Sequence, residues 1–281
     1  VDEGRAGAIL DELAGRGILL DIVADGATQY VLPPPMAGFF EFSMMRVRTD
    51  IDQKLLAELF YRYLNVEEEF VKALFQAGET ELGRAFVHEN ALPDDVALEV
   101  LDHERATAII RDASHIGVGV CYCRHKMEHL GRDCDAPKNI CMTFNTVAAS
   151  LTRHGIARAI DASECLDLLD EAHDARLVQF GENVQNGVNF ICNCCGCCCE
   201  AMIAARRFGI LNAIQTTRYI PRLDPGACRG CGKCVAVCPV EAMSLGSAND
   251  PGRASKKASR LDGSVCLGCG VCVTVCPEGG L

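Results

Sequence analysis

Cysteine is the residue type that offers most chemistry in this sequence. The chain has 281 residues and 19 cysteines, and six of the cysteines fall within the stretch CNCCGCCC at positions 192–199. Thiols at this density serve as metal ligands or form disulfides, and disulfides are rare in the reducing cytosol. The N-terminal stretch VDEGRAGAIL lacks the basic and long apolar regions of a signal peptide. We therefore expect a cytoplasmic protein whose cysteines bind metal.

Two copies of one cysteine motif lie near the C-terminus. Each copy reads C-x2-C-x2-C-x3-C-P, a spacing that lets the chain curl around a four-iron cluster. The curl needs backbone angles that glycine adopts most easily, and glycine fills positions 230, 232, 268 and 270 between the cysteines. The first copy contains Cys228, Cys231, Cys234 and Cys238, and the second contains Cys266, Cys269, Cys272 and Cys276.

Over about residues 218–281 the sequence resembles the bacterial two-cluster ferredoxin module. The resemblance implies two 4Fe-4S clusters, and it implies that the fourth cysteine of each run ligates the cluster of the other run. The segments YIPRLD, MSL and ASRLD are expected to form short strands, and the polar insertion GSANDPGRASKKASR is expected to be a solvated loop or a docking element. The implied ligand sets are Cys228, Cys231, Cys234 and Cys276 for one cluster, and Cys266, Cys269, Cys272 and Cys238 for the other.

The spacing of the cysteines in the middle region does not match the C-x2-C-x2-C-x3-C-P motif. A zinc site needs paired C-x2-C knuckles and only four ligands, so zinc explains too few of them. The stretch 192–199 contains three overlapping C-x2-C pairs, and its adjacent cysteines point to different sides of the backbone. We therefore predict two further 4Fe-4S clusters at close range, completed by the loop 121–141, with two thiols of the stretch left spare. The predicted ligands are Cys121, Cys123, Cys134, Cys141, Cys192, Cys194, Cys195, Cys197, Cys198 and Cys199.

Other side chains near these cysteines could contribute to the same chemistry. Arg206 and Arg207, on the expected helix EAMIAARRFG, could offset the negative charge of thiolate-bound iron. His125 and His129 are four residues apart and could supply a ligand or a proton, although a position on a helix surface is the commoner role. Cys165, within the helical stretch SECLDLLDEAH, is expected to be a buried apolar residue.

The pattern of the whole chain predicts an α+β protein with four parts. Residues 1–38 combine a helix with two β-rich runs around the turn dipeptide Asp25-Gly26, and they resemble the end of a winged-helix domain. Residues 39–115 form a helical region, which includes one or two helices expected over 94–116. Residues 116–215 form a cysteine-rich middle module, and residues 216–281 form the C-terminal ferredoxin-like module.

The net charge and the hydropathy of the chain restrict the kinds of partner that it can bind. The formal net charge is −11, and residues 17–45 contain no Lys or Arg, so we predict no nucleic-acid binding and a packing or dimer role for the front hairpin. No apolar run is long enough to cross a membrane. An acidic surface suits docking to a basic face of a protein partner, and a homo- or hetero-oligomer is compatible with this composition.

Three stretches, MAGFFEFSMMR, CYCRHKMEH and ICNCCGCCCEAM, resemble a group of bacterial 4Fe-4S ferredoxin-like proteins that carry several clusters. The resemblance spans most of the chain and implies bound clusters without a substrate. No Gly-rich nucleotide loop, HExxH motif or nucleophile elbow is present, so a flavin or nicotinamide would have to sit on a partner.

The favoured interpretation is an electron-transfer subunit of an anaerobic oxidoreductase complex, which relays electrons to or from a partner that carries a flavin or a metal. One alternative is a redox enzyme with an atypical cluster in the middle module, since adjacent-cysteine motifs do redox chemistry in the heterodisulfide-reductase group. The other alternative is a redox-sensing regulator that signals to the front segment.

Overall fold

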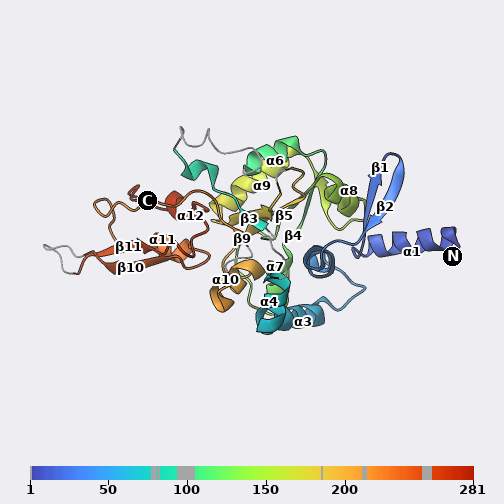
Figure 1. The fold of residues 1–281 in the computed structure, drawn as a ribbon, viewed down its shortest axis with the longest axis horizontal. Coiled ribbons are helices and arrows are strands. Elements are labelled where there is room, and N and C mark those ends of the chain that lie inside the picture. Colours follow the sequence, from blue (N-terminus) through green and yellow to red (C-terminus); the bar gives the residue numbers. More distant parts are fainter. Residues whose placement is uncertain are drawn as a thin grey trace.

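The structure is a computed structural model that describes residues 2–76, 81, 83–93, 105–184, 186–210, 214–248 and 255–281. The described chain mixes helices and strands, which confirms the α+β prediction. Figure 1 shows the N-terminal helix and hairpin at one end of the long axis and the C-terminal module at the other end. A sheet flanked by helices lies between them.

A seven-stranded sheet of order β6-β4-β5-β8-β7-β3-β9 forms the centre. Neighbouring strands are antiparallel, except that β3 and β9 are parallel. The register places Cys141 opposite Gly119 and Cys192 opposite Phe180, so cysteines lie on the inner strands. The strands are β3 (Gly83–Ala85), β4 (Ile116–Val120), β5 (Asn139–Phe144), β6 (Arg158–Ile160), β7 (Val178–Glu182), β8 (Phe190–Cys194) and β9 (Ile214–Gln215).

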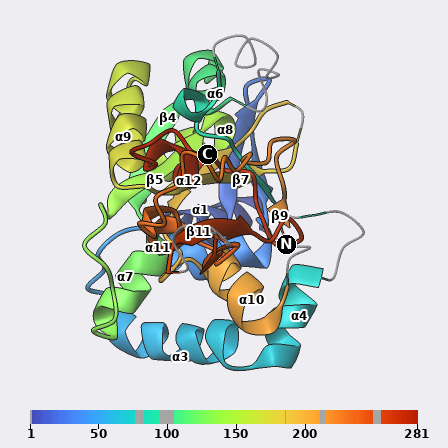
Figure 2. The same cartoon turned by 90° about the vertical axis from the view of Figure 1, so that its left-hand side faces the viewer.

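Helices lie on two sides of this sheet. Helices α6 (Ala106–Asp112) and α9 (Ala162–Asp174) lie on one side, where their apolar side chains form a core with β4 and β5 (Figure 2). The opposite side carries α3 (Gln53–Asn65), α7 (Tyr122–His129) and α10 (Glu200–Phe208). Most middle-module cysteines pack in the apolar clusters on this second side, whereas Cys165 belongs to the cluster of the first side and Cys197 is exposed.

The front of the chain is helix α1 (Glu3–Gly15) and the hairpin of β1 (Leu20–Ala24) and β2 (Ala27–Val31). Asp25 and Gly26 form the turn with φ angles of 51° and 77°, as the hairpin prediction requires. The described residues give the winged-helix interpretation no support, because β1 packs instead on helix α8 (Asn145–Arg153) of the middle module.

The π-helix η1 (Met36–Glu41) begins before the region predicted to be helical and ends within it. That region also contains α2 (Phe42–Met44), α3, α4 (Glu68–Gln76), the short η2 (Glu89–Ala91) and α6. It also contains β3, which the helical pattern does not predict. Because β3 joins the central sheet, the sheet crosses the boundary expected at residue 115. Residues 94–104, for which helix is predicted, lie outside the described residues.

The C-terminal module contains the short helices α11 (Lys233–Val237) and α12 (Val271–Thr274) and the antiparallel pair β10 (Met243–Ser247) and β11 (Lys257–Leu261). The strands predicted from MSL and ASRLD are therefore present. The strand predicted from YIPRLD is not, since residues 219–224 have no strand pairing. Within the described residues, no helix has the length and apolar character that crossing a membrane requires.

Candidate metal centres

The eight cysteines of the C-terminal module surround two cavities of about 20 Å³ each. Each fourth cysteine follows a short helix, α11 or α12, which carries the chain across to the other cavity. The geometry therefore groups the cysteines in the crossed manner that the resemblance implies, and their role as iron ligands remains a prediction. One cavity is lined by Cys228, Cys231, Cys234 and Cys276, and the other by Cys238, Cys266, Cys269 and Cys272.

Backbone N–H groups point at several of these sulfurs. The N–H of Ser259 donates to Cys228 Sγ at 3.4 Å, and the N–H of Ala242 donates to Cys238 Sγ at 3.2 Å. The Ser259 hydrogen bonds lower the pKa of the Cys228 thiol, which favours the thiolate that binds iron. The four glycines between the ligands have φ angles of 68° to 80°, so the curl depends on them as predicted.

Four middle-module thiols form a compact set, which we name the four-cysteine group. Cys134 comes from the loop before β5, and Cys195, Cys197 and Cys198 come from the loop between β8 and α10. Their sulfur atoms all lie within 4.8 Å of one another.

The other six thiols form the six-cysteine group. All six line one cavity of about 240 Å³, which Cys195 of the four-cysteine group also lines. Cys194 and Cys195 fall in different groups, and so do Cys198 and Cys199, as expected for neighbours that point to different sides of the backbone, but the adjacent Cys197 and Cys198 share the four-cysteine group. Of the three overlapping C-x2-C pairs, however, only Cys195 and Cys198 stay in one group. The members of the six-cysteine group are Cys121, Cys123, Cys141, Cys192, Cys194 and Cys199.

Residues 227–279 match the family model described as the 4Fe-4S dicluster domain. The C-terminal module is thus a ferredoxin-like iron–sulfur module. No curated protein and no solved structure matches the chain. The match covers the dicluster domain alone, so the chemistry of the middle module depends on its own geometry.

Arg124 lies between the two thiol groups with no solvent exposure. Its Nη1 donates to the carbonyl oxygen of Asn193 at 3.1 Å, while Nε and Nη2 have no protein oxygen or nitrogen as a partner. The guanidinium faces thiols of both groups. The neighbouring thiols of Cys197 and Cys198, and to a smaller extent Arg124, lower the pKa of Cys195. Arg124 is not predicted from the sequence, in which Arg206 and Arg207 are the favoured cations.

Arg206 and Arg207 make different contacts in the structure. Arg206 donates to the carbonyl oxygen of Gly196 and pairs with Glu241 at 2.9 Å, so it holds the cysteine loop. Arg207 is exposed and lies over the ring of Phe208. His125 is buried and bonds through Nδ1 to the carbonyl oxygen of Met44 at 2.7 Å, so it does not lie on a helix surface. Cys165 is fully buried in α9, as predicted.

A buried polar triad fixes the elements that carry the six-cysteine group. Lys126 on α7 forms an ion pair with Glu200 at the start of α10, and its Nζ donates to Asn65 Oδ1 at 2.6 Å. Asn65 Nδ2 donates to Glu200 Oε2 at 2.6 Å. Because Glu200 follows Cys199 and Lys126 lies three residues after Cys123, the triad sets the separation of these two thiols.

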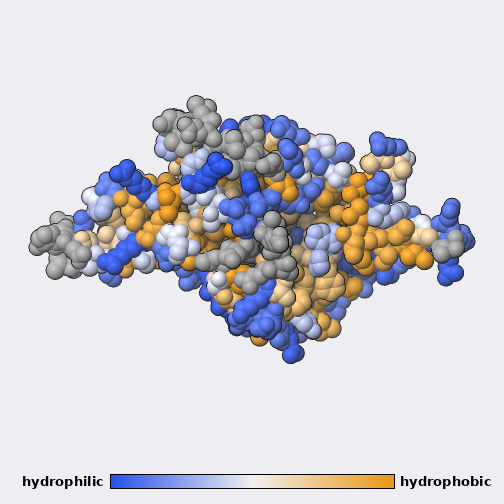
Figure 3. All heavy atoms as spheres, in the orientation of Figure 1, coloured by the Kyte–Doolittle hydropathy of each residue, from blue (hydrophilic) through white to orange (hydrophobic). Residues whose placement is uncertain are grey.

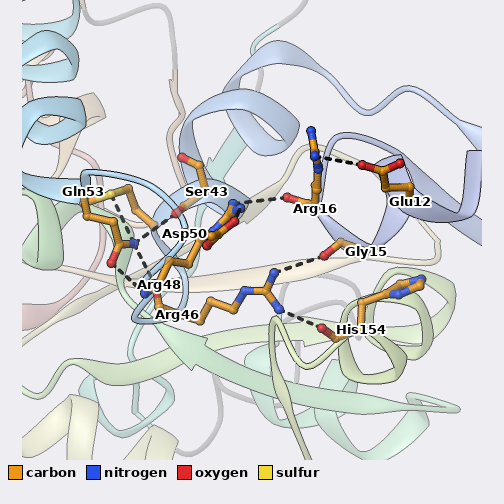
Figure 4. A network of polar contacts seen from close by, with 10 residues as sticks. Glu12, Gly15, Arg16, Ser43, Arg46, Arg48, Asp50, Gln53 and His154 are labelled. Carbon is orange, nitrogen blue, oxygen red and sulfur yellow. Dashed lines mark hydrogen bonds and ion pairs between the residues drawn. The ribbon is translucent and has the colours of Figure 1, made fainter. Parts of the chain in front are cut away.

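A second polar network fixes the segment between α2 and α3 (Figure 4). Arg46 donates to the carbonyl oxygens of His154 and Gly15 at 2.8 and 3.1 Å, and Gln53 donates to that of Arg46 at 2.9 Å. The preceding residue, Met45, accepts a hydrogen bond from Val120 N at 2.9 Å. The front of the chain thus helps to hold Cys121.

The 240 Å³ cavity extends beyond the cysteines. Its remaining walls are mostly apolar and include Phe42, Phe180 and Phe190. Glu41, at the end of the π-helix, also lines it, and burial together with the charges of Cys121 and Cys199 raises the pKa of Glu41 to about 8.

The two modules meet at the cysteine loop. A Cβ atom on Gly196 would lie 2.9 Å from the carbonyl oxygen of Pro239 and 3.0 Å from its Cα. Pro239 follows Cys238, a predicted ligand of the dicluster domain. Only glycine allows the middle cysteines to approach that domain so closely.

Proposed function

We propose that this chain is a multi-cluster electron-transfer protein that relays electrons between its dicluster domain and a further iron–sulfur cluster in the six-cysteine group. One apolar cluster contains Cys194 and Cys199 of the six-cysteine group together with Cys269 of the dicluster domain, and this packing carries the proposal because it brings thiols of both sites into one core. Iron–sulfur clusters supply one-electron transfer when bound. Arg124 offsets thiolate charge, and the Lys126–Glu200 pair keeps the ligand-bearing helices in place.

The proposed partner is a flavin- or metal-containing oxidoreductase of the cytoplasm. The acidic charge of the chain supports docking to a basic face. Figure 3 also shows exposed apolar surface toward the N-terminal end. The exposed large apolar side chains include those of Leu32, Phe39 and Val47. Partner surfaces commonly combine such apolar patches with a polar rim.

A redox titration of the anaerobically reconstituted full chain tests the proposal. The dicluster domain alone should take up about two electrons, so the full chain should take up at least about three. Cys192→Ser should remove only the additional electron, because Cys192 belongs to the six-cysteine group. An uptake of about two electrons with about eight iron atoms per chain would contradict the proposal.

The cavity supports a second candidate, a redox enzyme. The cavities of the dicluster domain measure about 20 Å³ each, whereas that of the six-cysteine group measures about 240 Å³. The larger cavity has room for a small apolar substrate beside a cluster. An uncharged thiol such as 1-propanethiol should then change the EPR spectrum of the middle cluster, and 3-mercaptopropionate should not. If neither thiol changes that spectrum, the enzyme candidate is wrong and electron transfer is the proposed function.

A further inference from the structure

The sulfur atoms of the four-cysteine group lie at a characteristic spacing. Cys134 Sγ is 3.7 Å from Cys195 Sγ and 4.0 Å from Cys198 Sγ, and Cys198 Sγ is 3.7 Å from Cys197 Sγ. Every pair of these sulfur atoms lies within 4.8 Å, so no element has to move to bring the four thiols together.

This spacing fits a single metal ion. Four thiolates at about 2.3 Å from one tetrahedral ion place their sulfurs ~3.8 Å apart. In a 4Fe-4S cluster each thiolate binds a different iron atom, so the sulfurs have to stand farther apart. The dicluster domain gives a comparison within the molecule, because none of its described cysteines belongs to a set of three or more ligands within 4.8 Å.

The protein holds both loops of the site by contacts that need no metal. Lys138 pairs with Asp133 at 2.8 Å and with Glu128 at 2.6 Å, which fixes the loop that carries Cys134. Arg206 holds the carbonyl oxygen of Gly196 between Cys195 and Cys197. Arg124 beside Cys195 offsets part of the negative charge of four thiolates.

We propose that Cys134, Cys195, Cys197 and Cys198 bind one tetrahedral metal ion, zinc or iron, in place of the second middle 4Fe-4S cluster that the sequence predicts. Four protein ligands fill the coordination of such an ion, which is the pattern of a structural site. The ion ties the loop before β5 to the loop before α10, next to the junction with the dicluster domain. The site does not depend on a cluster in the six-cysteine group.

Counting both metals in the anaerobically purified full chain tests the site. Three clusters contain about twelve iron atoms, so we expect about twelve iron atoms with one zinc, or about thirteen iron atoms. About eight iron atoms with one zinc would keep this site and contradict the cluster of the six-cysteine group. About sixteen iron atoms without zinc, or eight iron atoms without any other metal, would overturn the site.

Two matched variants locate the ion. Cys197→Ser should lose one ion per chain and retain the cluster iron, whereas Cys141→Ser should lose about four iron atoms and retain the single ion. Loss of cluster iron alone from Cys197→Ser would overturn the assignment. Cobalt substitution of the unmodified chain tests the site without a variant, because Co²⁺ bound by four thiolates has intense visible bands. If cobalt enters without these bands, the tetrathiolate site is wrong.

Discussion

Single residues around the thiols show what a sequence can and cannot reveal. All the candidate ligands are predictable, because cysteine at this density has few other roles. Their division into groups of four and six is not, since it depends on Cys134 reaching Cys195 from a distant loop. Arg124 and Lys126 are also missed, because arginine and lysine almost always lie at the surface, and here both have no solvent exposure.

Lys126 offers a prediction at this scale. Lys126→Met leaves the Glu200 carboxylate buried without its cation, and breaking such a pair costs about 3–5 kcal/mol of unfolding free energy. Denaturant unfolding of the anaerobic protein measures this loss. The double variant Lys126→Met/Glu200→Leu removes both charges and should recover most of the lost stability. A single variant as stable as the unmodified protein would show that the pair does not hold α7 to α10.

At the scale of elements, local signals are readable and long-range pairing is not. The hairpin follows from Asp25-Gly26, and the curls of the dicluster domain follow from their glycines. The central sheet has short strands such as β3 and β9, which have three and two residues and pair Gly83 with the distant Ile214. A strand of two or three residues is too short to show the alternation of apolar and polar residues by which a strand is predicted.

The docking of the hairpin on α8 gives the next prediction. Ser150 Oγ donates to Asp21 Oδ1 at 2.6 Å, and Arg153 and His154 contact Asp21 Oδ2. Asp21→Asn weakens these charge-assisted contacts, so we expect a loss of about 1.5–3 kcal/mol near neutral pH. Asp25→Asn on the same hairpin is the matched control, because Asp25 is exposed at the turn.

The effect of Asp21→Asn should depend on pH. Burial alone would raise the pKa of Asp21, but the contacts with Ser150, Arg153 and His154 lower it overall. A carboxyl group with a lowered pKa in the folded state stabilises that state above its unfolded pKa of about 3.9, and the contribution disappears as the pH falls through the folded pKa. The difference between the two proteins should therefore shrink below about pH 4. Hydrogen exchange of β1 would measure it, and a constant difference would exclude the carboxylate as its source.

At the scale of the molecule, the middle module and the dicluster domain are joined by a shared apolar core. Val240, Leu267 and Val271 of the dicluster domain pack in one apolar cluster with Ala201 and Met202 of α10. We expect a fragment of residues 216–281 to bind about eight iron atoms, because all eight cysteines are local. It should lose them at a lower temperature than the full chain, since this shared apolar surface becomes exposed. Equal thermal stability in an iron-release assay would show that the core contact contributes nothing.

The junction itself gives the last prediction. Gly196→Ala places a methyl group 2.9 Å from the carbonyl oxygen of Pro239, and because backbone lies on both sides of that contact, the two modules have to move apart. The iron content should stay unchanged, since Gly196 has no side chain to bind metal, while electron exchange between the dicluster domain and the middle cluster should slow. Freeze-quench EPR after partial reduction measures that rate. Gly7→Ala is the control, because a Cβ atom on Gly7 meets no atom within 4 Å. Equal exchange rates in both variants would mean that electrons do not pass through this contact.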